Sequence, residues 1–145
     1  MRSICELAEI MTFGPIDKPK ENAVETRASF YYLEEGLLIH IINKPKDLHG
    51  IEDAKENIVA LRNMSNGVPH LLLIDVTHIK SIERGARELY ASEGNPHRVK
   101  AVALLTNSIV GRIVGNFFIG FNKPEVPTRL FIDERLARSW LAKQV

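Results

Sequence analysis

The sequence lacks the residues and motifs by which many enzymes and metal proteins are first identified. Its 145 residues include one cysteine, Cys5, so the chain has no internal disulfide and no metal site built on paired thiolates. A single thiol is typical of a reducing compartment, and we expect a cytoplasmic protein. There is no Gly-x-Ser-x-Gly elbow, no phosphate loop ending in Lys-Ser/Thr, and no Gly-x-Gly-x-x-Gly after a strand. The common hydrolase and nucleotide-binding signatures are therefore absent.

An excess of charge of one sign is also lacking. The 19 basic and 18 acidic residues give a formal net charge of +1. This balance gives no reason to expect nucleic acid or an anionic membrane as the main partner. The hydrophobic share of 45% and the charged share of 26% are those of an ordinary globular protein. The length suits one domain with a core of its own.

No segment has the composition of a signal peptide or a membrane span. Glu6 and Glu9 interrupt the N-terminal stretch, which a signal peptide would need to be uncharged and apolar. The longest mostly apolar stretch is Val99–Phe121, but Arg112 near its centre alone costs about 2.5–3.5 kcal/mol on insertion scales. Its polar middle, Thr106-Asn107-Ser108, is better explained as a joint between a strand and a helix. We therefore expect a soluble protein.

The five histidines do not have the spacing of metal ligands on one helix. His40 lies inside an apolar strand, where a hydrogen-bonded core histidine is favoured over a ligand or a catalyst. His49 and His97 fall in loops and are expected to face solvent. We predict no metal site and no cofactor.

The most informative stretch is His70–Tyr90, which has the pattern of a buried strand, a loop and an amphipathic helix. The apolar run Leu71–Ile74 is unbroken, as in a central strand covered on both faces of a parallel sheet. Ligands and partners of such sheets usually meet the carboxyl ends of the strands. In this sequence that end is Asp75-Val76-Thr77-His78.

The remaining elements follow from periodicity. Alternation after Glu25 and a turn at Glu34-Glu35-Gly36 predict a hairpin whose inner strand is Leu37–Ile42. A helix follows, with inner positions Ile51, Ala54, Ile58 and Leu61, outer positions Lys55, Glu56, Asn57 and Arg62, and an end at Asn66-Gly67. Further strands are predicted at Val99–Leu105 and Arg129–Ile132. The last helix, capped by Asp133, is expected to place Leu136, Ala137, Trp140 and Leu141 inward and Arg135, Arg138 and Lys143 outward.

These elements predict an α/β fold with a mostly parallel sheet of four to five strands, an antiparallel N-terminal hairpin and about four helices. We expect residues 1–23 to be an N-terminal extension and residues 24–145 to form a single domain.

Two groups of polar residues are candidates for chemistry. Asp75 and His78 could work together as acid and base, with the hydroxyls of Thr77 and Ser81 nearby. An aspartate at a strand end also commonly caps the following turn, and that structural role is favoured. Asn107 and Ser108 begin a helix whose free amides could hold an anion, as those of any capped helix could.

The helix after Ser108 is apolar around most of its circumference, with Arg112 and Asn116 as its polar stripe. Its glycines, Gly111 and Gly115, favour close packing in the core over a contact between subunits. The excess apolar surface at Phe117 and Phe121 keeps two further possibilities open, an oligomer contact and a pocket for an apolar ligand.

The segment DVTHIKSIERGARELY resembles the central segment of STAS domains, the SpoIIAA-like anti-sigma-factor antagonists. That segment runs Asp-Leu-Ser-x-Val-x-x-Ile-Asp-Ser-Ser-Gly, and the matching residues here are Asp75, Thr77, Ile79, Ile82 and Glu83. The chain is also similar to small bacterial proteins of SpoIIAA-like fold, which share a GNFF-type third helix and a lead into the last strand like Pro124–Phe131. The resemblance implies a SpoIIAA-like fold over about five-sixths of the chain.

The chain differs from that family at the position of the family's regulatory serine. The regulatory serine of the family would fall at Gly85, and a glycine has no hydroxyl to carry phosphate. We expect a non-enzymatic binding or regulatory domain with a protein partner or a second copy as its ligand. The alternative is a small carrier of apolar ligands or lipids, and an enzyme using Asp75 and His78 comes third. The expected binding surface comprises Asp75, Thr77, His78, Ser81, Arg84, Gly85, Asn107, Ser108, Arg112, Asn116, Phe117 and Phe121.

Overall fold

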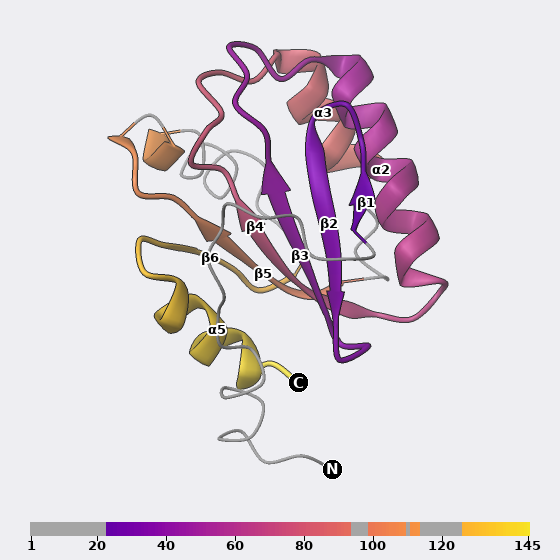
Figure 1. The fold of residues 1–145 in the computed structure, drawn as a ribbon, viewed down its shortest axis with the longest axis vertical. Coiled ribbons are helices and arrows are strands. Elements are labelled where there is room, and N and C mark those ends of the chain that lie inside the picture. The colour runs from indigo at the N-terminus through magenta and orange to yellow at the C-terminus, as the bar shows by residue number, and fades with distance from the viewer. Residues whose placement is uncertain (1–22, 94–98, 110, 114–125) are drawn as a thin grey trace.

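The computed structural model describes residues 23–93, 99–109, 111–113 and 126–145 (Figure 1). These residues form a mixed sheet with the strand order β1-β2-β3-β4-β5-β6. The strands are β1 (Val24–Glu25), β2 (Ser29–Glu34), β3 (Leu38–Asn43), β4 (His70–Asp75), β5 (Val99–Leu105) and β6 (Thr128–Phe131). The helices are α2 (Ile51–Ser65), α3 (Arg84–Glu93) and α5 (Glu134–Ala142), and residues 109 and 111–113 are also helical.

The predicted fold class is confirmed. β2 and β3 pair as an antiparallel hairpin, and β3, β4, β5 and β6 pair in parallel. The tight turn of the hairpin places Glu35 and Gly36 at positive φ, 52° and 65°. The sheet has one strand more than expected, because the two-residue β1 pairs with β2 at the edge. So short a segment carries too little periodicity to be recognised as a strand.

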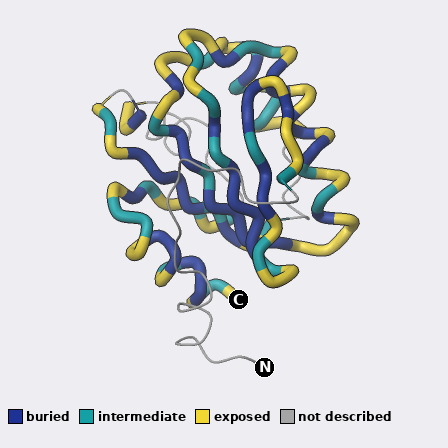
Figure 2. The backbone as a smooth tube through the Cα atoms, viewed as in Figure 1, coloured by how far each residue is buried: buried dark blue, intermediate teal, exposed yellow. Residues whose placement is uncertain are grey.

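Helices cover both faces of the sheet (Figure 1). On one face, Ile39, Ile41 and Leu72 pack with Ala60 of α2. On the other face, residues of β3, β4 and β5 pack with α5 through Leu38, Leu71, Leu73, Ala101, Ala103, Ala137 and Leu141. The buried residues accordingly follow the central strands and the inner sides of the helices (Figure 2). Burial on both faces explains the unbroken apolar run in β4.

The predicted orientation of α5 is wrong at two positions. Leu136, expected to point inward, is 60% exposed, whereas Arg138, expected to point outward, is 2% exposed. The inner row of this helix is Glu134, Ala137, Arg138 and Leu141, with the spacing of three and four residues that defines one helix face. Arg138 therefore lies in the core, where its charge needs a partner.

The apolar stretch considered above as a membrane span begins with the strand β5. In the part of the chain that the structure describes, no helix has both the length and the apolar character needed to cross a bilayer.

Candidate functional site

The two loops that follow β3 and β4 are paired with each other at the carboxyl ends of the parallel strands. Isolated parallel bridges join Lys46 to Ile79 and His49 to Ile82. The backbone amide of His49 donates to the carbonyl of Ser81 (2.9 Å), and the amide of Glu83 donates back to the carbonyl of His49 (2.8 Å). The loops thus extend the β3–β4 pairing beyond the sheet and have a fixed backbone.

Side chains reinforce this pairing. The hydroxyl of Ser81 donates to the backbone carbonyl of Asp47, and Lys80 Nζ lies 3.0 Å from Asp47 Oδ1. The carboxylate of Glu83 accepts from the backbone amide of Ile51 (3.0 Å), at the start of α2. A carboxylate is favourable at that place because the free amides of a helix N-terminus carry partial positive charge.

The two candidate acid–base residues, Asp75 and His78, differ in their surroundings. Asp75 is buried, and its Oδ1 accepts from the backbone amide of Thr77 (2.8 Å), which is the capping role that the sequence favoured. His78 is exposed, as are Ser81 and Arg84. Arg84 forms an i, i+4 ion pair with Glu88, at 2.9 Å. His78 and Ser81 lie in the loop between β4 and α3, and Arg84 is the first residue of α3.

Gly85 is the contact point between α3 and α2. A Cβ atom added at Gly85 would lie 2.5 Å from Cδ1 and 2.9 Å from Cγ1 of Ile51. Both distances are shorter than carbon atoms tolerate, so a side chain at position 85 would require that of Ile51 to move. The position is half-buried in a helix contact.

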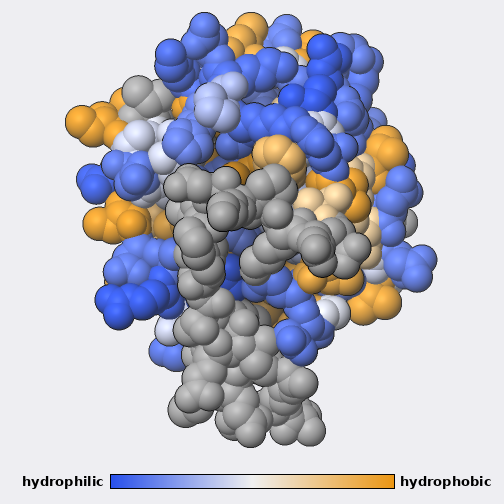
Figure 3. All heavy atoms as spheres, viewed as in Figure 1, coloured by the Kyte–Doolittle hydropathy of each residue, from blue (hydrophilic) through white to orange (hydrophobic). Residues whose placement is uncertain are grey.

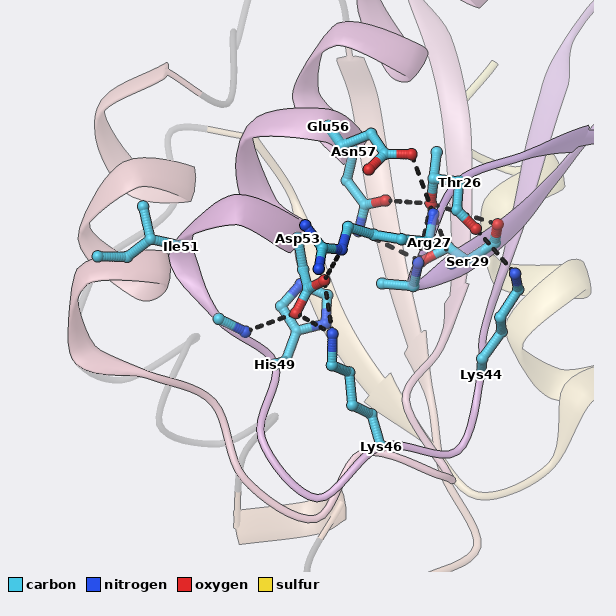
Figure 4. Close-up of polar contacts among 12 residues, drawn as sticks. Thr26, Arg27, Ser29, Lys44, Lys46, His49, Ile51, Asp53, Glu56 and Asn57 are labelled. Carbon is cyan, nitrogen blue, oxygen red and sulfur yellow. Dashed lines mark hydrogen bonds and ion pairs between the residues drawn. The ribbon is translucent and has the colours of Figure 1, made fainter.

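A buried hydrogen-bond network joins α2 to Thr26 and to Ser29 of the hairpin (Figure 4) and continues to the end of β4. Asn57 Oδ1 accepts from the hydroxyl of Thr26 (2.7 Å), and Asn57 Nδ2 donates to Ser29 Oγ (3.2 Å). The hydroxyl of Ser29 donates to Asn43 Oδ1 (2.8 Å), and Asn43 Nδ2 donates to the backbone carbonyl of Asp75 (2.8 Å). Burying these groups is tolerated because each has a hydrogen-bond partner.

The carboxylate of Asp53 joins the first turn of α2 to the loop that precedes this helix. Figure 4 shows its carboxylate between Lys46 and Arg27, with Lys46 Nζ at 2.6 Å and Arg27 Nε at 3.3 Å. Burial acts to raise the pKa of Asp53, but the hydrogen bonds from Lys46 and from the backbone amide of Gly50 outweigh it and lower the pKa. Asp53 is therefore an ionised anchor of the fold.

A second buried cluster lies on the opposite face of the sheet, under α5. The guanidinium of Arg138 contacts both carboxylate oxygens of Glu34, at 2.7 and 3.2 Å. His40 lies 3.8 Å from Glu34 and 3.7 Å from Glu134. Burial lowers the pKa of His40, and the charge of Arg138 lowers it further, against the opposing effect of Glu34. His40 is thus buried, as its place in an apolar strand predicts.

The structure describes some of the candidate residues around the third helix and not others. Asn107 and Arg112 are exposed, and Ser108 Oγ accepts from the backbone amide of Gly111 (2.8 Å), as a capping residue does. Asn116, Phe117 and Phe121 lie outside the described residues. His97 lies outside them too.

Sequence reasoning missed His49, Asn57 and Tyr90 as members of one polar contact. His49 was expected in solvent but is 2% exposed, and its Nε2 lies 2.7 Å from the hydroxyl of Tyr90. Asn57 was assigned to the outer face of its helix but is buried. The spacing of Ala54, Asn57 and Leu61 places the asparagine on the inner face, and this signal was available. Nothing in a loop sequence shows that His49 is covered by another loop.

Comparisons with known proteins agree with this fold. The model of the family Domain of unknown function (DUF7793) matches residues 31–145. A solved structure from Shewanella loihica PV-4, an uncharacterised protein of the DUF3478 family with a SpoIIAA-like fold, is 18% identical. It covers 83% of this chain and 90% of its own, with a TM-score of 0.56. A comparison with curated proteins finds no match.

A protein of unknown function from Arthrobacter sp. FB24 is 26% identical over 83% of this chain and 97% of its own, with a TM-score of 0.30. The likeness to the Shewanella structure shows the fold alone. Since the family model spans most of the sequence, the chain belongs to the family Domain of unknown function (DUF7793) and has a SpoIIAA-like fold.

Proposed function

We propose that the protein is a non-enzymatic binding or regulatory domain that uses the paired loops and the first turns of α3 to bind a protein partner. The observation that carries the proposal is the backbone pairing between the loops after β3 and β4. A surface held in one conformation before binding loses less conformational freedom when the partner arrives. The paired loops supply such a surface at the edge of the sheet where partners usually bind.

The chemistry of this surface supports a polar partner. The side chains of Lys80 and Arg84 are 75% and 83% exposed, and His78 and Ser81 are exposed beside them. In Figure 3 the upper part of the visible face, over the ends of β3 and β4, is mostly hydrophilic. Apolar residues are gathered at the two sides of that view instead. A protein with complementary charged and polar groups fits this edge.

The placement of Asp75 and His78 supports binding over catalysis. The carboxylate of Asp75 is occupied by the backbone amide of Thr77, and His78 points to solvent from the next turn. A general acid–base pair requires the two groups to converge within hydrogen-bond distance of one substrate.

In this proposal position 85 is a packing contact and carries no phosphate. The Gly85→Ser protein is expected to lose about 1 kcal/mol of unfolding free energy, because the overlap with Ile51 costs more than the better helix propensity returns. The double variant Gly85→Ser with Ile51→Ala should show a smaller loss than the sum of the two single changes, measured by urea unfolding. Additive losses would mean that Ile51 does not determine the residue at position 85.

The partner surface is tested by affinity capture from cells of the source organism, with matched charge-reversal variants. The double variant Lys80→Glu with Arg84→Glu is expected to retain about tenfold less of the partner than the wild type, since it reverses two exposed charges of the surface. The control is Lys55→Glu, which reverses an exposed charge on α2. Equal recovery with all three proteins would contradict the proposed surface.

A further inference from the structure

The hydroxyl of Tyr90 connects α3 to two other elements. It lies 2.7 Å from Nε2 of His49, in the loop before α2, and 3.0 Å from Nδ2 of Asn57, within α2. The rings of His49 and Tyr90 are also in contact, with centroids 5.8 Å apart. One polar atom of α3 therefore reaches both the paired loops and the neighbouring helix.

The direction of the hydrogen bond between Asn57 and Tyr90 follows from the other contact of Asn57. Its Oδ1 accepts from the hydroxyl of Thr26, so its Nδ2 is the donor to Tyr90. The oxygen of Tyr90 then accepts from Asn57, and the hydroxyl can donate its own hydrogen to Nε2 of His49 when that nitrogen carries no proton. Nε2 of His49 is such an acceptor in the neutral ring that carries its proton on Nδ1.

Within the described part of the chain, α3 itself contributes one fully buried residue. Ala86 is the buried residue of this helix, and Gly85 supplies the close approach to Ile51 one position earlier. Glu88, Ser92 and Glu93 are exposed. The contact at Tyr90 links the second half of α3 to α2 and to the loop before α2.

We propose that the Tyr90 hydroxyl, held between Asn57 and His49, is a proton-sensitive latch for α3: it is closed while His49 is neutral and opens when His49 is protonated. A proton on Nε2 turns the acceptor into a donor that faces the hydroxyl hydrogen of Tyr90. The tyrosine then has two donors pointing at its oxygen and must turn its own hydrogen away. The latch acts whether or not the proposed partner surface is correct.

The charged and titratable groups around His49 come from the two paired loops and from both helices. Lys46 lies in the loop before α2, Asp53 in the first turn of α2, Glu83 in the loop before α3, and Tyr90 on α3. Burial lowers the pKa of His49, with Asp53 opposing and Lys46 assisting. A lowered pKa means that the neutral form is favoured by folding. The latch is therefore fully closed above about pH 6.5, the ordinary histidine value, and loosens as the pH falls below it.

Amide hydrogen exchange at pH 7.5 and pH 5.5, corrected for the intrinsic effect of pH, tests the latch. In the wild-type protein the amides of residues 88–93 are expected to exchange about tenfold faster at pH 5.5, as for the loss of one buried hydrogen bond. The amides of β4 serve as the reference for global unfolding. No change in α3 relative to β4 would overturn the proposal.

Variants separate the latch from a general effect of acid. His49→Gln keeps an acceptor for Tyr90 but does not titrate, so its α3 amides should exchange alike at both pH values. His78→Gln removes an exposed histidine of the next loop and should keep the wild-type response. Tyr90→Phe should exchange fast at both pH values. A pH response that survives His49→Gln, or nitrogen chemical shifts showing His49 protonated at Nε2 at pH 7.5, would contradict the latch.

Discussion

Replacing Arg138 with methionine is expected to lower the free energy of unfolding by about 3–5 kcal/mol, the largest effect of any single change considered for this protein. The guanidinium is 3% exposed and contacts both oxygens of Glu34, whose side chain is 12% exposed. Methionine fills a similar volume but leaves that carboxylate buried without its cation. The measurement is urea unfolding followed by circular dichroism.

The matched control is Arg135→Met on the same helix, where the side chain is 88% exposed and the expected change is within about 0.5 kcal/mol. The double variant Arg138→Met with Glu34→Gln should recover part of the loss, because the buried negative charge is then removed as well. If Arg138→Met unfolded no more easily than Arg135→Met, the ion pair would contribute nothing to the docking of α5.

Gly111→Ala is expected to cost about 1–3 kcal/mol. A Cβ atom at this position would lie 2.0 Å from Thr106 Oγ1 and 2.8 Å from Ser108 Oγ. Thr106 is fully buried, and its hydroxyl accepts from the amide of Ser108 (3.1 Å), so it cannot move without breaking the turn. The loss should appear in urea unfolding and outweigh the better helix propensity of alanine.

The same substitution at Gly50 is the control for Gly111. A Cβ atom there would lie 3.3 Å from the nearest atom, a side-chain oxygen of Glu83, and the backbone is extended at φ −98°. Gly50→Ala should therefore cost no more than about 1 kcal/mol, the usual price of alanine at a helix N-cap. Equal losses at Gly50 and Gly111 would mean that the overlap with Thr106 is relieved without cost.

Much of the fold could be predicted because its signals are local. The bounds of β5, the left-handed end of α2 at Asn66 and the cap at Asp133 were all predicted from single residues or short periods. The parallel order followed from the alternation of strands and helices. Neighbouring residues in the sequence determine each of these features.

The candidate site was less predictable because its contacts are not local. The pairing of His49 with Ser81 and of Glu34 with Arg138 joins residues 32 and 104 positions apart, and no periodic pattern encodes them. The two polar residues on inner helix faces, Asn57 and Arg138, are buried although their polarity alone predicts exposure. In both helices the row at three- and four-residue intervals identifies the buried side correctly.

The affinity of the captured partner for purified variants tests most directly whether the paired loops form the working surface. Isothermal titration of that partner should give similar dissociation constants for the wild type and Lys55→Glu, and a dissociation constant about tenfold higher for Lys80→Glu with Arg84→Glu. All three proteins should have the same melting temperature. An unchanged dissociation constant for the double variant would place the partner elsewhere on the molecule and contradict the proposed function.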